Sequence, residues 1–177
     1  MAAIEASRGS PTFSVRAATG VLGAALAAGG TVFAMRNGST RRVFVTRITA
    51  AFSATVAFTA ASQQLFVVER FTAATPTGGT AYTPMPHGSH GASQIADARA
   101  STTAALTTAA VVFAGAQIPI LGAASPAVST NVAGGLDLSD DPITLGFDEG
   151  LCIRNAVVWP VAGTGSLTAV VSWFESN

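Results

Sequence analysis

Lysine is absent from all 177 residues of this chain. The nine basic residues are arginines, and nine acidic residues balance them, so the formal net charge is zero. Without lysine the chain cannot form a phosphate-binding P-loop, a protein-kinase strand lysine or a Schiff base. The lack of a basic excess also argues against general nucleic-acid binding, because contacts with phosphates need cations.

Charged residues of either sign are scarce, at 10% of the chain. A chain with so few charges and no net charge is prone to self-association. Hydrophobic residues make up 49%, which argues against disorder. Alanine, threonine and glycine dominate, whereas membrane spans are rich in leucine, isoleucine, valine and phenylalanine. We therefore expect a protein whose surface is covered by copies of itself or by partners.

The sequence signals for membrane insertion or secretion are weak. Residues 17–35 are uncharged, but they contain four glycines and few large aliphatic residues, so we expect neither a span nor a signal peptide. Cys152 is alone and cannot form an intrachain disulfide, so assembly in a cytoplasm is expected. Asn37-Gly38-Ser39 matches a glycosylation sequon, yet Asn-Gly between two strand-like runs favours a hairpin turn.

Hydrophobic periodicity predicts strands along most of the chain. Residues 51–60 alternate strictly, with phenylalanine, valine and alanine on one face and mainly serine and threonine on the other. Residues 72–93 contain the prolines and glycines of a long loop. The other predicted strands are 31–36, 40–48, 64–71, 143–147, 151–159 and 166–174, with less regular ones within 95–113 and 117–121.

These short strands, separated by turns, predict an all-β fold. We expect an antiparallel, jelly-roll-like β-sandwich over residues 17–177, with an eight-stranded barrel or immunoglobulin-like sandwich as alternatives. Residues 1–16 lack a sustained period and predict an extended N-terminal arm. The arm is expected to pack on a neighbouring subunit or shell, or else to fold back along its own sandwich as an edge strand. Its predicted contacts are Ile4, Phe13 and Val15, with Arg8 and Arg16 in ion pairs.

Residues able to carry chemistry are few. His87 and His90 lie in a glycine-rich loop, where simple exposure is better supported than metal binding with Asp97. The serine between them lacks the nucleophile elbow of a hydrolase. Cys152 lies in an alternating strand, which favours a small buried side chain over a thiol nucleophile. We expect no enzyme activity, cofactor or metal.

Charged residues gather in two places. Arg41, Arg42 and Arg47 form a basic cluster, which is either a solvated hairpin edge or a docking patch, because arginine suits interfacial ion pairs. Acidic residues crowd into a second segment, whose spacing does not match a calcium loop and favours turn-forming roles. They are Asp137, Asp140, Asp141, Asp148 and Glu149.

Four segments of the C-terminal third are informative together. They are Pro142-Ile143-Thr144-Leu145, Glu149-Gly150-Leu151-Cys152-Ile153-Arg154-Asn155, the turn Gly163-Thr164-Gly165 and the strand end Val171-Ser172-Trp173-Phe174-Glu175. In these segments the chain resembles small virion proteins of tailed bacteriophages. Gly30-Thr31-Val32-Phe33 and the strand at 64–70 are similar to the same proteins, so the likeness extends over residues 29–175. It implies a jelly roll that coats a capsid or belongs to a head or tail appendage, and it implies no catalytic residue.

Together these features predict a capsid decoration (cement) protein that binds the major capsid protein, or other virion proteins, on the outside of a phage head. By analogy with other coats we expect a homo-oligomer, most simply a trimer, without nucleic-acid or membrane partners. A tail or head-fibre component is one alternative. A secreted carbohydrate-binding or adhesion domain is another, although its typical sugar platforms would be only Trp159, Trp173 and Tyr82.

Overall fold

The computed structural model describes residues 10–23, 30–56, 62–89, 91–101, 106, 108–120, 132–156 and 163–176. Throughout these ranges the regular elements are strands, as the sequence predicts. No helix in the described part is long and apolar enough to cross a membrane. Of the predicted partner contacts, Ile4 and Arg8 lie outside these ranges.

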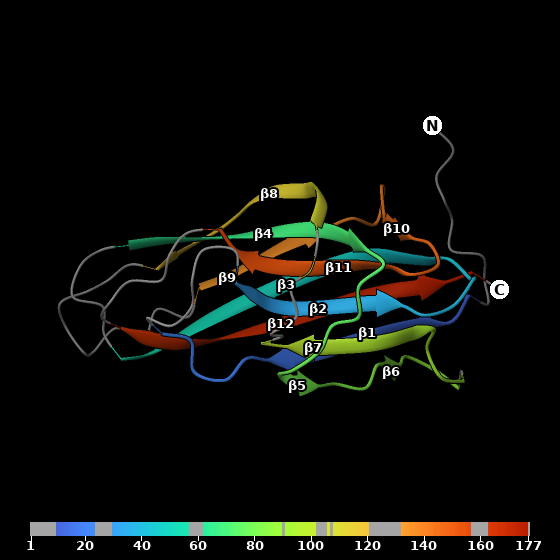
Figure 1. Cartoon of the computed structure of the whole chain (residues 1–177), viewed down its shortest axis with the longest axis horizontal. Helices are drawn as coiled ribbons and strands as arrows, with labels where there is room; N and C mark the ends of the chain where they lie inside the picture. The colour runs from blue at the N-terminus through green and yellow to red at the C-terminus, as the bar shows by residue number, and fades with distance from the viewer. Residues whose placement is uncertain are drawn as a thin grey trace.

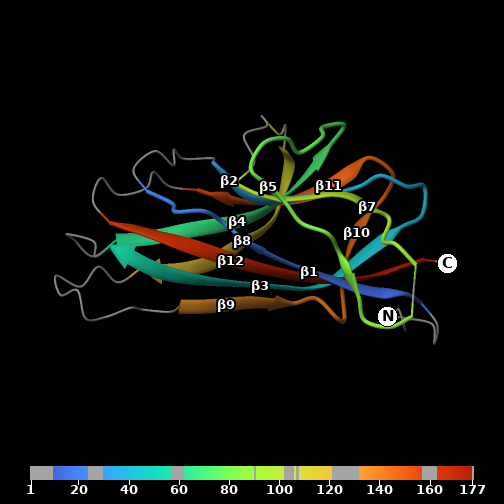
Figure 2. The ribbon, with the colours of Figure 1, turned by 90° about the horizontal axis from the view of Figure 1, so that it is seen from below.

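Two antiparallel sheets pack face to face as a β-sandwich (Figure 1). Figure 2 shows the two sheets as separate layers. Sheet A contains β1 (Thr12–Ala18), β3 (Val43–Val56), β6 (Met85–Pro86), β9 (Val132–Asp137), β10 (Ile143–Leu145) and β12 (Thr164–Glu175). Sheet B contains β2 (Thr31–Asn37), β4 (Ser62–Thr72), β5 (Thr80–Ala81), β7 (Ile95–Ala100), β8 (Thr108–Ile120) and β11 (Glu149–Asn155).

The long strands pair in a nested order along the chain. The outermost pair is β1 with β12, followed inward by β2 with β11, β3 with β9, and β4 with β8. Cross-pairs of β12 with β3 and of β11 with β4 join these pairs into the two sheets. The short strands β5 and β6 and strand β7 extend the edges next to β2 and β1.

The hydrophobic core lies between the sheets and is rich in aromatic side chains. Phe13, Phe33, Phe52 and Trp173 are each 1% exposed. Phe13 and Trp173 are cross-strand partners whose ring centroids lie 6.0 Å apart. Burying each such side chain contributes roughly 2–3 kcal/mol, so the core is the main source of stability.

Two glycines pack beneath phenylalanine rings in these sheets. A Cβ at Gly150 in β11 would lie 2.1 Å from Cζ of Phe71, and a Cβ at Gly165 in β12 would lie 2.1 Å from Cζ of Phe52. Neither ring could keep its position above a larger residue, since the neighbouring backbone is also within contact distance. Glycine is therefore required at both positions by close packing.

The N-terminal arm is shorter than predicted, because residues 12–16 belong to β1 and lie between β12 and β6. Phe13 and Val15 are each 1% exposed in the core of their own sandwich, so the prediction that they contact a partner is wrong. Their pattern is that of a strand, with Phe13, Val15 and Ala17 buried and Arg16 exposed. Residues 12–16 thus lie along their own sandwich, which is the alternative that the sequence left open for the arm.

The predicted hairpin at Asn37-Gly38 is also wrong. Strands β2 and β3 belong to different sheets, so residues 38–42 cross from one layer to the other. Asn37 is fully buried at this crossing, where its side chain bonds to backbone carbonyls of Arg41 in the crossing turn, of Leu145 in β10 and of Gly146 just after it. Local sequence cannot separate this role from a hairpin turn, because both place Asn-Gly between strands.

Other predicted boundaries shift by a few residues. The ambiguous region 95–113 divides into β7 and β8, with Ser101 in the left-handed region at φ 55° just after β7. Residues 117–120 are the end of β8 rather than a separate strand. Strand β10 ends at Leu145, which leaves Phe147 in a turn. The predicted strand segments 57–60 and 157–159 lie outside the described residues.

Candidate interaction surfaces

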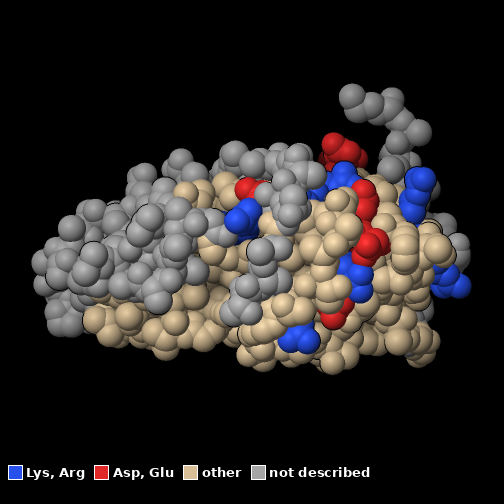
Figure 3. Space-filling view, in the orientation of Figure 1, with Lys and Arg blue, Asp and Glu red and all other residues tan. Residues whose placement is uncertain are grey.

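The polar contacts of the described residues gather at one end of the sandwich, on the right in Figure 1. We call it the clamped end, and it contains the turns 38–42, 138–142 and 146–148. At the opposite, uncharged end, the described residues 18–23, 53–56 and 163–168 include no charged side chain. In Figure 3 the charged side chains drawn in colour lie over the middle and the right of this face.

Asn37 holds two of these turns together. Its Nδ2 donates to the carbonyl oxygens of Arg41 at 2.7 Å, Gly146 at 3.0 Å and Leu145 at 3.3 Å. Its Oδ1 accepts from the backbone N–H of Ser39 at 3.0 Å. One buried side-chain amide therefore bonds to backbone groups of two chain segments, the turn 38–42 and residues 145–146, which fixes the turns relative to each other.

The turn 146–148 is held on both sides of Phe147. Glu149 Oε2 accepts from the Gly146 N–H at 2.6 Å and from Arg70 Nη2 at 2.8 Å. The Asp148 N–H donates to the Asn37 carbonyl at 3.1 Å, and the Asp148 carboxylate pairs with Arg36. Asp148 adopts a left-handed conformation with φ 60°. Phe147 is thus fixed at a turn tip, although 64% of it is exposed.

Ion pairs cross sheet B. Arg36 Nε lies 3.4 Å from Asp97, and Arg154 Nη1 lies 3.1 Å from Glu69. With Asp148 and Glu149 also paired, part of the predicted acidic cluster serves to hold strands and a turn. Such partly exposed pairs contribute up to about 1 kcal/mol each.

The remaining arginines of the predicted partner surface, Arg16, Arg41, Arg42 and Arg47, are exposed. Within the described part of the chain, none of the four forms an ion pair within 4.0 Å. Arg16 lies on β1, and Arg47 lies on β3 opposite Asp137. Arg41 and Arg42 lie on the inter-sheet turn and not on the edge of a hairpin.

A groove of about 330 Å³ lies at the clamped end on the outer face of sheet A. The strand register places Phe174 and Ser172 on this face, opposite the core side chains Phe13 and Trp173. The Phe174 ring stacks on Phe44 with centroids 4.8 Å apart. The groove is lined by Thr12, Phe13, Thr46, His87, Ser139, Ser172, Trp173 and Phe174.

One wall of this groove belongs to the acidic turn. Ser139 lines the groove, and the flanking Asp140 and Asp141 are exposed. Asp137 Oδ1 accepts from the Ser139 hydroxyl and N–H, and these hydrogen bonds lower the pKa of the Asp137 carboxyl below its usual value. The groove therefore combines aromatic and hydroxyl groups, and its wall at Ser139 belongs to the turn that also carries Asp140 and Asp141.

Within the described ranges, the residues that the sequence offers for metal or nucleophile chemistry lie apart from one another. His87 is exposed, and its Nε2 lies 2.8 Å from the Ser14 hydroxyl, whereas His90 lies outside the described residues. No metal-binding group of three or more histidine, cysteine or acidic side chains occurs in the described ranges. Cys152 is fully buried against Ala34 and Phe71, and burial raises the pKa of its thiol to about 12.

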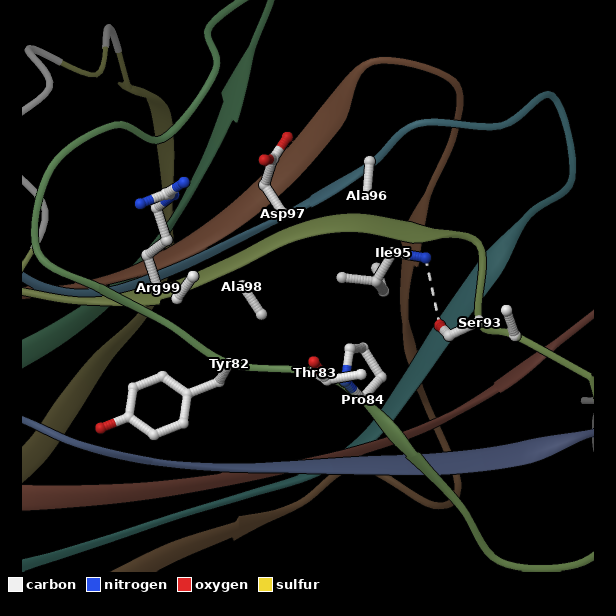
Figure 4. Close-up of a pocket in the computed structure, with 11 residues that line it drawn as sticks. Tyr82, Thr83, Pro84, Ser93, Ile95, Ala96, Asp97, Ala98 and Arg99 are labelled. Carbon is white, nitrogen blue, oxygen red and sulfur yellow. Dashed lines mark hydrogen bonds between the residues drawn. The ribbon is translucent and has the colours of Figure 1, made fainter.

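A second pocket, of about 370 Å³, lies between β7 and residues 81–84 (Figure 4). Asp97 and Arg99 point away from the Tyr82–Pro84 segment in this view, so their charges do not converge with it on one ligand position. The Tyr82 hydroxyl bonds to the backbone N–H and carbonyl of Ala18. Trp173 is only 1% exposed. Tyr82 and Trp173, two of the three expected sugar platforms, are therefore both held in contacts within the fold. The third, Trp159, lies outside the described residues.

No protein family model matches the chain, and no curated protein or solved structure matches it either. Functional inference therefore rests on the strand pairing and on the surfaces described above. The most developed surface is the clamped end, where Phe147, Arg41 and Arg42 are exposed on fixed turns. Sequence patterns do not single out Phe147, because it follows strand-like residues and continues their alternation.

Proposed function

We propose that this protein is a structural virion protein, a decoration protein that binds the outside of a bacteriophage head and stabilises it. The observation that carries this proposal is the nested pairing of the long strands, β1 with β12, β2 with β11, β3 with β9 and β4 with β8. Wrapping an antiparallel ribbon of four such pairs into two sheets produces a jelly roll. We therefore propose a jelly roll with β5, β6 and β7 added at its edges.

The surface supports a role in assembly rather than in catalysis. A jelly roll alone does not define function, so the argument also needs the surface chemistry. Arg16, Arg41, Arg42 and Arg47 are exposed cations without an ion-pair partner among the described residues. Arginine forms strong bidentate contacts with carboxylates at protein interfaces. We propose that these residues contact the major capsid protein or other copies of the chain, with the copies forming a homotrimer.

A tail or head-fibre component of the particle would use the same fold and the same exposed arginines. The carbohydrate-binding alternative is less well supported, because Trp173 is buried and the Tyr82 hydroxyl is bonded to backbone. Binding of sugars by stacking needs exposed aromatic faces. We therefore place the protein on the capsid surface after assembly in the host cytoplasm.

A binding assay with particles produced without this protein tests the proposal. Purified protein is expected to co-sediment with such heads, to saturate at a fixed number of copies per head, and to raise the temperature at which the heads release DNA. Empty tails and unrelated heads are the controls. Saturable binding to tails alone would favour the fibre alternative, and no binding to any particle would contradict a virion role.

A further inference from the structure

We propose that Phe147, flanked by Arg41 and Arg42, docks into the outer groove of sheet A on a second copy of this chain. This inference rests on the self-association proposed above and assigns its two surfaces. The first surface is the knob, defined as Phe147, Arg41 and Arg42. The second is the acidic groove, defined as the 330 Å³ groove that Ser139 and Phe174 line together with the neighbouring Asp140 and Asp141.

The knob has the composition and rigidity of an interface anchor. Phe147 is 64% exposed, while the residues on both sides of it are held by Asn37, Arg36 and Glu149. Aromatic residues and arginine are the residue types most enriched at the centres of protein interfaces. Because the turn is already fixed, docking would cost little ordering entropy.

Arg41 and Arg42 form hydrogen bonds through their backbone groups, which leaves their guanidinium groups available to a partner. The Arg41 carbonyl accepts from Asn37, and the N–H of Arg42 donates to the Ser176 hydroxyl at 3.0 Å. Among the described residues, no carboxylate lies within ion-pairing distance of either guanidinium. The knob therefore requires an apolar pocket with carboxylates beside it.

The acidic groove of the same chain supplies that chemistry. Its volume of about 330 Å³ exceeds that of a phenyl ring, and Phe174 offers an aromatic wall. Asp140 and Asp141 are exposed on the turn that contributes Ser139, and neither forms an ion pair among the described residues. Charge complementarity between the knob and the acidic groove thus selects another copy of this chain as the occupant.

The two surfaces cannot meet within one chain. Val43 pairs with Leu145 and Val45 pairs with Ile143, so Arg42 and Asp141 lie beyond opposite ends of this short ladder. Their separation along β3 is about five residues, or roughly 17 Å at ~3.3 Å per residue, which exceeds the Debye length of about 8 Å. Since knob and groove are different patches, the contact is heterologous and builds a ring or a filament.

Sedimentation velocity on the purified protein, without particles, tests the contact. Phe147→Ala is expected to weaken self-association by about 30-fold, the loss typical of an aromatic anchor. Val21→Ala is the matched control, because Val21 is 72% exposed at the uncharged end and should change nothing. A monomeric wild type would overturn self-association itself. An oligomer that Phe147→Ala leaves intact would overturn only the assigned surfaces.

Charge reversal and mixing make the test independent of folding defects. Arg41→Asp with Arg42→Asp should dissociate the oligomer, as should Asp140→Arg with Asp141→Arg, and combining all four changes should restore it. In a heterologous contact, Phe147→Ala retains a groove and the Asp140→Arg, Asp141→Arg variant retains a knob. The two should remain monomeric alone, because each lacks one surface. If the assigned contact is wrong, mixing the two variants will not produce a complex.

The expected result of mixing is a 1:1 complex, formed by the knob of the Asp140→Arg, Asp141→Arg variant and the groove of the Phe147→Ala variant. It should grow no further, since the other two surfaces are disabled. Failure of the mixture to associate, or failure of the fourfold charge reversal to restore the oligomer, would overturn the assigned contact. Head binding by the same variants, measured separately, distinguishes this outcome from failure of the virion role.

Discussion

The two ends of the sandwich share one core but differ in how their surfaces are held. At the clamped end, buried Asn37, the Glu149–Arg70 pair and the Arg36–Asp148 pair fix the inter-strand turns. At the uncharged end, the bonds among described residues are between neutral groups, such as the hydroxyls of Thr55 and Thr164 at 2.8 Å. The segments that connect these strand ends in the sequence, 19–30, 57–61, 121–131 and 156–163, also contain no charged residue.

This difference separates two tasks that a β-sandwich must perform. Packing of aromatic side chains holds the sheets together along the whole length, as Phe13 and Trp173 do near one end and Phe52 near the other. Among the described residues, polar side chains also fix the turns at the clamped end. The few charges of this chain are thus concentrated where they fix turns and offer contacts.

The largest expected effect is at the clamp itself. Asn37→Ala removes the partner of the Arg41, Leu145 and Gly146 carbonyls in a buried site, and should lower the free energy of unfolding by about 3 kcal/mol. Thr55→Val at the uncharged end should change it by less than about 0.5 kcal/mol. Urea denaturation measures both. Equal effects of the two substitutions would contradict the difference between the ends.

The next effect should be the same at both ends, because it concerns packing. Gly150→Ala forces a methyl group against Phe71, and Gly165→Ala forces one against Phe52. Each should destabilise the fold by about 2 kcal/mol, as overpacking does in other cores. The measurement is again urea denaturation of the two single variants. If only one of them is destabilising, the core does not extend evenly along the sandwich.

A smaller effect is expected from Glu149→Gln. The amide keeps an acceptor for the Gly146 N–H but loses the ionic attraction to Arg70, at a cost of about 1 kcal/mol at low salt. Thermal unfolding in low and high salt should show the cost shrinking as salt screens the pair. A salt-independent loss would mean that the charge of Glu149 is not what holds the turn.

The smallest expected effect is that the Cys152 thiol of the folded protein does not react with an alkylating reagent. Burial raises the pKa of Cys152 to about 12, so its thiol remains protonated and covered at neutral pH. Native protein should not react with iodoacetamide between pH 7 and 9, whereas protein unfolded in urea should react rapidly. Mass spectrometry of the intact chain measures the extent. Rapid labelling of the native state would show that the outer face of sheet B opens around Cys152.

Periodicity in the sequence predicted the strands but not their partners. Alternation in residues 51–60 is a local property and is confirmed as far as Val56, where the described part of β3 ends. The pairing of β2 with β11 and β7 depends on residues far away in the chain, so Asn37-Gly38 was mistaken for a hairpin. Strand β1 has only seven residues, so its side chains alternate over a short stretch. The sequence therefore left open whether this segment is an arm or a strand of the sandwich.

The candidate surface was only partly predictable for the same reason. Arg41 and Arg42 were identified from their charge, which is visible in sequence. Phe147 was assigned to a strand, and its exposure depends on Asp148 and Glu149 reaching partners on β2 and β4. Such long-range contacts leave no local period. The arginine pair is therefore evident from composition, whereas the aromatic anchor beside it is evident only in three dimensions.

Cryo-electron microscopy of phage particles that contain this chain tests the virion role most directly. The expected density is a β-sandwich on the outside of the head, in closed clusters of three copies, with the turn containing Phe147 of each copy against sheet A of the next. Density for the sandwich at the tail, or particles without the protein while it accumulates outside the cell, would contradict a capsid decoration protein.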